Sequence, residues 1–196
     1  MHVISTGQQS PEELLGILEQ IHPFTDYIHL REKTWTDHDW EKAMDSLTQR
    51  GIPSQKIIIN QRIDIAHRMK AKGVQLTHQS IDPATAKHSY GHLRIGCSVH
   101  SVSEAVTAEN SGADYLVYGH IFASASKPDL TPKGLQKLTN VTQNTSVPVI
   151  AIGGITPENT PDVLASGASG IAVLSGILLD PDPLEAIQRY QHQLHD

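Results

Sequence analysis

The segment VPVIAIGGITPENTPDVLASGASGIAVLSGI (residues 147–177) contains two short apolar runs, at 148–152 and 170–174, separated by a stretch of helix length. Pro157 opens the intervening stretch and Gly167 closes it. Apolar runs that alternate with helix-length segments are typical of parallel strands joined by helices that cover the sheet. The segment therefore predicts a strand–helix–strand unit.

The same alternation extends over the whole chain, and eight strands and eight helices in strict order favour one (β/α)8 TIM barrel, an α/β fold, with residues 1–196 as a single domain. An open doubly wound sheet is the alternative. The chain of 196 residues is shorter than the roughly 250 residues of a typical barrel, so its connections must be short. Strands are predicted at 2–5, 27–30, 56–60, 74–76, 94–99, 114–119, 148–152 and 170–174, and helices at 11–21, 37–50, 64–72, after 83, and at 101–110, 132–143, 157–165 and 183–194.

Composition and charge restrict the partners. The formal net charge is −6 without a basic run, which argues against nucleic acid and anionic membranes. No apolar run approaches the ~18 residues of a membrane span, and the N-terminal residues do not have the pattern of a signal peptide. The single cysteine, Cys97, excludes an internal disulfide and is expected to be a buried thiol. We expect a cytoplasmic protein and leave a homo-oligomer open.

Polar residues follow the predicted strands at one common end. Catalytic groups of (β/α)8 barrels lie at the C-terminal ends of the strands, so these residues are the candidates for a site. They are Arg31 and Lys33, Asn60 with Gln61 and Arg62, Thr77 and His78, Ser98 and His100, His120 and Lys127, Gly153 and Gly154, and Ser175 and Gly176.

The two last strand ends predict a phosphate-binding site. Gly153 and Gly154, together with Leu174 and Ser175, lie where such barrels usually bind phosphate. Glycine lets backbone N–H groups approach phosphate oxygens, and a short helix N-terminus adds a favourable dipole. The alternative is that the glycine pair only turns the chain.

His120 is the candidate general acid and base, because an imidazole can accept and donate a proton near neutral pH. The alternative is a structural, hydrogen-bonded histidine.

Arg31 and Lys33 offer positive charge to a substrate carboxylate or phosphate, or else form a solvated pair. Asn60 either orients the substrate or has a capping role.

Three further residues, Ser98, His100 and Lys127, complete the predicted substrate-binding set. His78 and His100 are potential metal ligands, but no carboxylate shares their loops at a ligand-like spacing. The residues therefore predict neither a metal site nor a cofactor.

Seven segments in this order resemble the thiamine phosphate synthase/TenI superfamily over essentially the whole chain. The resemblance implies a (β/α)8 barrel with a thiamine-related phosphate ligand. The segments are HLREK (29–33), NQRIDIA (60–66), GVQL (73–76), IGCSVHS (95–101), GADYLVYGHIF (112–122), VPVIAIGGI (147–155) and GIAVLSGI (170–177).

Two activities occur in this superfamily. The synthases join a pyrimidine diphosphate to a thiazole phosphate with Mg²⁺, and their pattern has acidic residues where this chain has Gln61 and Ser80. Their strand-6 motif reads G-P-I-F, whereas this chain reads Gly119-His120-Ile121-Phe122.

On this comparison the chain resembles the TenI branch, the thiazole tautomerases, more than the synthases. This implies a metal-free isomerase that acts on a phosphorylated carboxythiazole. His120 would transfer the proton, the glycine loops would hold the phosphate, and Arg31, with Lys33 or Lys127, would bind the carboxylate. The alternatives are a thiamine phosphate synthase that tolerates Gln61 and Ser80, and a non-catalytic regulatory protein that binds a thiamine intermediate.

Overall fold

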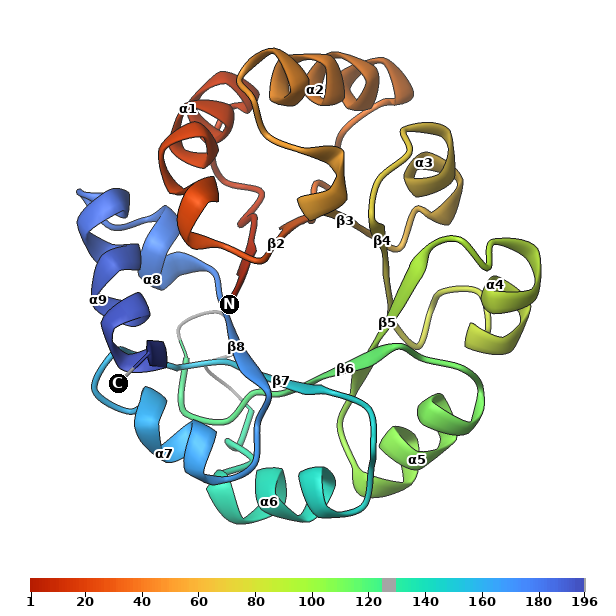
Figure 1. Cartoon of the computed structure of the whole chain (residues 1–196), viewed down its shortest axis with the longest axis vertical. Coiled ribbons are helices and arrows are strands. Elements are labelled where there is room, and N and C mark those ends of the chain that lie inside the picture. Colours follow the sequence, from red (N-terminus) through yellow and green to blue (C-terminus); the bar gives the residue numbers. More distant parts are fainter. Residues whose placement is uncertain (125–129, 196) are drawn as a thin grey trace.

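Eight parallel strands form a closed barrel in the computed structural model, which describes residues 1–124 and 130–195 (Figure 1). Each strand pairs with its neighbour in sequence, and β1 pairs with β8 to close the ring. The predicted (β/α)8 fold is confirmed, and the open sheet is excluded. The strands are β1 (His2–Ile4), β2 (Tyr27–Leu30), β3 (Ile57–Asn60), β4 (Gly73–Leu76), β5 (Arg94–Val99), β6 (Tyr115–Gly119), β7 (Val149–Ile152) and β8 (Gly170–Val173).

Helices surround the barrel on its outside, as the view along the axis shows (Figure 1). A four-residue helix, α8, lies between β8 and the last long helix and was not among the eight predicted ones. The helices are α1 (Pro11–Ile21), α2 (Asp37–Gln49), α3 (Ile63–Arg68), α4 (Pro83–Ser89), α5 (Val102–Asn110), α6 (Leu135–Gln143), α7 (Thr160–Ala165), α8 (Ser175–Leu178) and α9 (Pro183–His195), with single 3₁₀ turns η1 (His22–Phe24) and η2 (Ser54–Lys56).

The main core lies between the strands and the helices. Outward-facing strand residues such as Val3, Ile28 and Ile59 are fully buried there against apolar helix residues. Cys97 belongs to this core, and burial raises the pKa of its thiol to about 12, as expected for a structural cysteine. The outward-facing positions of the strands are therefore apolar because the helices cover the outer face of the sheet.

The barrel interior is partly polar. A small apolar cluster that includes Ile4, Val117 and Ile150 fills one part of it. Elsewhere the Nδ1 of His2 lies 2.8 Å from the Nε2 of His29, and both rings are buried. Burial lowers the pKa of His2 to about 2 and that of His29 to about 3, so both are neutral near pH 7.

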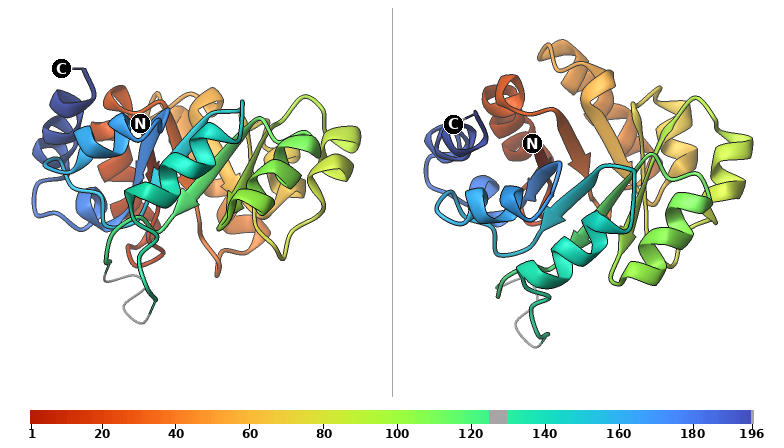
Figure 2. Two further views of the ribbon diagram at one scale, coloured as in Figure 1. Left: turned by 90° about the horizontal axis from the view of Figure 1, so that it is seen from below. Right: turned by 60° about the horizontal axis from the view of Figure 1, so that its bottom comes forward.

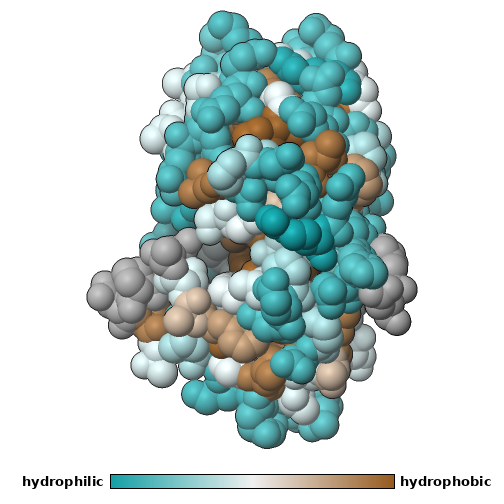
Figure 3. Space-filling view, turned by 90° about the vertical axis from the view of Figure 1, so that its left-hand side faces the viewer, coloured by the Kyte–Doolittle hydropathy of each residue, from teal (hydrophilic) through white to brown (hydrophobic). Residues whose placement is uncertain are grey.

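The described residues that follow β2 and β6, 31–36, 120–124 and 130–134, extend beyond the same end of the barrel (Figure 2). The side of the molecule that faces left in Figure 1 is covered mainly by hydrophilic side chains, with scattered hydrophobic patches (Figure 3). Among the described residues, none of the helices has the length and apolar character needed to cross a membrane.

Candidate functional site

The C-terminal ends of the eight strands form the mouth of the barrel, because all neighbouring strands are parallel. This geometry brings together the candidates at the ends of different strands: Arg31 after β2, Asn60 in β3, Ser98 and His100 at β5, His120 after β6, Gly153 and Gly154 after β7, and Leu174 and Ser175 after β8. Lys127, also predicted to bind substrate, lies outside the described residues.

The end of β2 carries two cations and one buried carboxyl group. Arg31 is partly buried, whereas Lys33 is exposed. The backbone N–H of Arg31 donates to the Oγ of Ser5 at 2.7 Å. Glu32 between them is only 9% exposed, and burial raises the pKa of its carboxyl group, against smaller opposite effects of Ser5 and Arg31. Its Oε1 has no hydrogen-bond partner among the described residues. Sequence reasoning missed Glu32, although its position between two cations was a signal.

The β3–β4 edge of the mouth is a neutral hydrogen-bonded network. Gln61, directly after β3, donates from Nε2 to the Oγ1 of Thr77 at 3.0 Å. The N–H of Thr77, directly after β4, donates in turn to the Oγ of Ser80 at 3.0 Å. Gln61 has a positive φ of 66°, an uncommon conformation for a residue other than glycine. These three side chains present amide and hydroxyl groups without charge.

The two histidines at the ends of β5 and β6 are both held by backbone carbonyl groups. The Nδ1 of His100 donates to the carbonyl oxygen of Gly119 at 3.1 Å. The Nε2 of His120 donates to the carbonyl oxygen of Leu130 at 3.0 Å, and His120 is only 6% exposed. His120 therefore connects the end of β6 to the segment that precedes α6.

Packing explains the glycine pair after β7. A Cβ atom on Gly153 would lie 2.3 Å from the Cβ of His120, and one on Gly154 would lie 2.4 Å from the carbonyl oxygen of Ala123. Both glycines also have positive φ, at 99° and 66°. The pair is thus required by the close approach of two loops, and its use as a phosphate site stays a prediction.

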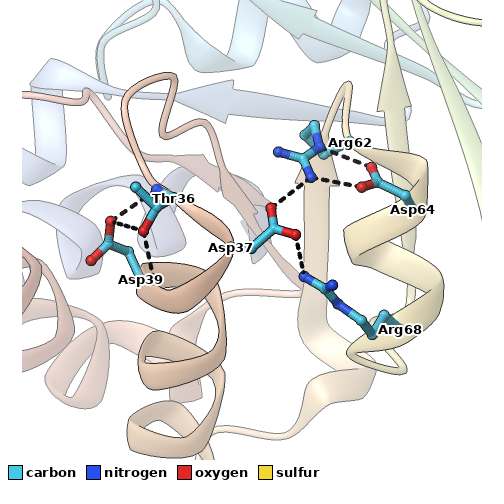
Figure 4. A network of polar contacts seen from close by, with 6 residues as sticks. All are labelled: Thr36, Asp37, Asp39, Arg62, Asp64 and Arg68. Atoms are coloured by element: carbon cyan, nitrogen blue, oxygen red, sulfur yellow. Dashed lines mark hydrogen bonds and ion pairs between the residues drawn. The ribbon is translucent and has the colours of Figure 1, made fainter.

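The arginine after β3 is engaged elsewhere. Arg62 donates to both Asp37 and Asp64, and Arg68 donates to the second oxygen of Asp37, so that the network joins α2 to α3 (Figure 4). The adjacent capping box of α2, Thr36 with Asp39, is a separate contact. The guanidinium of Arg62 is therefore committed to carboxylates of this chain.

Four buried polar atoms of inward-facing side chains have no hydrogen-bond partner within 3.5 Å among the described residues, although the side chains of His29 and Asn60 lie close enough to interact with each other. Two of them, on Gln75 and Tyr115, lie around Gly96, where a Cβ atom would meet both side chains within 2.4 Å. Sequence reasoning missed this polar interior, although a glutamine inside the strand GVQL was a visible signal. The atoms are Nδ1 of His29, Oδ1 of Asn60, Oε1 of Gln75 and OH of Tyr115.

The barrel is closed, its strands are parallel, and polar groups from several strands meet at their carboxyl ends, which is the architecture of (β/α)8-barrel enzymes. The family model TMP-TENI, described as thiamine monophosphate synthase, matches residues 1–177. The chain belongs to this family.

Named relatives agree with this membership. The thiamine-phosphate synthase of Chloroflexus aurantiacus is 40% identical over 153 residues, which cover 76% of this chain and 69% of that protein. The one of Chlorobium phaeobacteroides is 40% identical over 159 residues, which cover 80% and 77%. The solved thiamine phosphate pyrophosphorylase from Pyrococcus furiosus has a TM-score of 0.83 at 29% identity, and the match covers 98% of this chain and 94% of that one.

The expected thiazole tautomerase activity is wrong, because the relatives at 40–43% identity are named thiamine-phosphate synthases. That expectation depended on His120 in place of a proline and on the neutral residues Gln61 and Ser80. In the structure, the hydrogen bond from His120 to the carbonyl oxygen of Leu130 gives this residue a structural role, and this role does not involve proton transfer.

The Mg²⁺ that the synthase branch of the superfamily uses does not fit the residues present. Gln61 and Ser80 offer no charged oxygen, and both side chains already bond to Thr77. No group of three or more histidine, cysteine, aspartate or glutamate side chains suited to a metal ion occurs in the described part of the chain.

Proposed function

We propose that this chain is a thiamine-phosphate synthase, a transferase that joins a hydroxymethylpyrimidine diphosphate to a thiazole phosphate. The observation that supports the proposal most is the identity of about 40% to proteins of that name over three quarters or more of this chain. In this reaction, the thiazole nitrogen bonds to the methylene carbon of the pyrimidine. The bond from that carbon to the diphosphate oxygen breaks, and pyrophosphate leaves with the electron pair.

The phosphate of the thiazole would be held at the ends of β7 and β8. Backbone N–H groups at Gly153 and Gly154, where the chain has positive φ, would meet the phosphate oxygens. The first N–H groups of α8 at Ser175 have no partner within their own helix. The proposed role of Leu174 and Ser175 is therefore to complete this anion site.

The leaving diphosphate would be met at the end of β2. Arg31 and Lys33 supply positive charge there, and a guanidinium can bind two phosphate oxygens at once. Asn60, Ser98 and His100 lie at the ends of β3 and β5 and offer hydrogen bonds that would orient the pyrimidine. His120 is held by its bond to Leu130 and would position the glycine loop by packing against Gly153.

The decisive experiment incubates the purified protein with both substrates and Mg²⁺ and measures thiamine phosphate as its fluorescent oxidation product. The proposal expects catalytic turnover that is reduced in Arg31→Gln and unchanged in Lys42→Gln, a control at an exposed position of α2. Binding of thiazole phosphate without any product would overturn the synthase function and leave a barrel that only binds the intermediate.

A further inference from the structure

The β3–β4 edge of the mouth differs chemically from the rest of the strand ends. Its three side chains, Gln61, Thr77 and Ser80, bond to one another through neutral amide, hydroxyl and backbone groups. The Oγ atoms of Thr77 and Ser80 are also only 3.3 Å apart. The Gln61 amide nitrogen and the hydroxyl oxygens of Thr77 and Ser80 therefore all take part in hydrogen bonds within the edge itself.

A hard divalent cation needs several oxygen ligands, and in proteins at least one or two of them are carboxylates. The carboxylates nearest to this edge in sequence have other partners. Asp64 accepts two bonds from Arg62, and Asp82 accepts from the N–H of Thr85 as the N-cap of α4. Glu32 belongs to the end of β2, where it lies close to Ser5 and Gly7.

Positive charge does not replace the missing carboxylates at this edge either. Arg62, the next residue after Gln61, has its guanidinium bound between Asp37 and Asp64 (Figure 4). At the end of β2, Arg31 and Lys33 supply positive charge for an anionic ligand.

We infer that the Gln61–Thr77–Ser80 network takes the place of a divalent-cation site, so that this chain engages its phosphorylated substrates without a metal ion held by its own side chains. The identity of those substrates rests on the proposed function, whereas the absence of a cation site at this edge does not. Two carboxylates introduced at Gln61 and Ser80 are expected to create such a site.

The test is a titration with Mn²⁺, followed by its electron paramagnetic resonance signal, of wild type, of Gln61→Asp/Ser80→Asp and of the neutral control Gln61→Asn/Ser80→Thr. Wild type and control should bind Mn²⁺ with a Kd of about 1 mM or weaker, and the acidic variant at least about tenfold more tightly. Thermal unfolding checks that each variant is folded. If the double variant does not fold, each single aspartate variant should give a smaller gain.

Saturable binding of one Mn²⁺ by wild type with a Kd below about 100 µM, weakened by Gln61→Ala or Ser80→Ala, would overturn the inference. A folded acidic variant without any gain in affinity would also overturn it. Neither result depends on catalysis. If thiamine phosphate does not form, the proposed function fails while the Mn²⁺ titration still decides the inference.

Discussion

The imidazoles of His100 and His120 are both bonded to backbone carbonyl groups at the mouth of the barrel. This arrangement fixes the ring orientations before any ligand arrives, and it joins the ends of β5 and β6 to their neighbours. The sequence located both residues at strand ends, but it did not reveal these backbone partners, because every residue has a carbonyl group and the fold decides which one meets an imidazole.

Replacing His120 by alanine should lower the free energy of unfolding by about 0.5–1.5 kcal/mol through the lost hydrogen bond to Leu130, with a further loss from the vacated volume. Urea denaturation at pH 7.5 measures the change. The control His88→Ala, at an exposed position of α4, should stay within about 0.5 kcal/mol of wild type. Equal stability of both variants would contradict the structural role of His120.

Gly154→Ala is expected to destabilise the fold severely. The positive φ alone costs about 1–3 kcal/mol, and the new Cβ would collide with the carbonyl oxygen of Ala123. Gly16→Ala is the matched control, because Gly16 lies inside α1 with open space around it, and the substitution should stabilise the helix by about 1 kcal/mol. Thermal unfolding of the pair should therefore shift in opposite directions.

Arg31→Gln should impair catalysis more than folding. The loss of a charged hydrogen-bond donor is worth about 1.5–3 kcal/mol, which corresponds to about 10- to 100-fold in kcat/KM for thiamine phosphate formation. Arg31→Lys should recover part of this loss, since it keeps the charge without the planar two-point contact. Wild-type kinetics in the glutamine variant would remove Arg31 from the site.

At the level of elements, the apolar runs predicted the positions of the strands well, whereas the predicted ends of the helices were less accurate. The helix predicted at 64–72 ends at Arg68 because Lys70 has a positive φ of 52°. The helix predicted from 132 begins at Leu135, after Gly134 at a φ of 76°. Such turns depend on local backbone conformation, which the apolar period does not encode.

The start of α2 shows the opposite case, where the local sequence determines the structure. Thr36 accepts from the N–H of Asp39, and the Asp39 carboxylate accepts from the N–H of Thr36, a complete capping box. Thr36→Ala should therefore cost about 1 kcal/mol in urea denaturation. Thr107→Ala, at an exposed position inside α5, should be neutral or slightly stabilising. A neutral effect at Thr36 would show that tertiary packing alone holds this helix end.

At the level of the whole molecule, the sequence predicted the barrel and the strand ends that surround its mouth, but it did not predict how the interior is filled. Gln75 and His29 face inward as polar groups, and Glu32 lies buried beside two cations. Their positions follow from the strand register of the closed barrel, which a list of apolar runs does not contain. The choice of activity failed for a related reason, since three positions, His120, Gln61 and Ser80, were given more weight than similarity along the whole chain.

Acid should destabilise the barrel because of the buried His2 and His29. Their pKa values are about 2 and about 3 in the folded state against 6.5 when unfolded, so the unfolded chain binds protons first as the pH falls. Stability is thus complete above pH 6.5 and decreases below it, by about 2 kcal/mol per histidine at pH 5.

Urea denaturation at pH 7.5 and 5.0 measures this loss. His29→Asn should reduce the difference between the two pH values, whereas the exposed His88→Asn should leave it unchanged. An identical pH dependence in wild type and His29→Asn would show that another group causes the acid sensitivity.

The register that pairs His2 with Ala172 also has a consequence for the synthesis of this protein. On the ribosome, β1 emerges first, and its partner β8 is made only after most of the chain has left the exit tunnel. Until then the unclosed sheet has two open edges, β1 and the last strand formed, and both can pair with other polypeptides, a hazard of folding that depends on contacts between distant segments. Slower translation of the last strand would therefore prolong the aggregation-prone state.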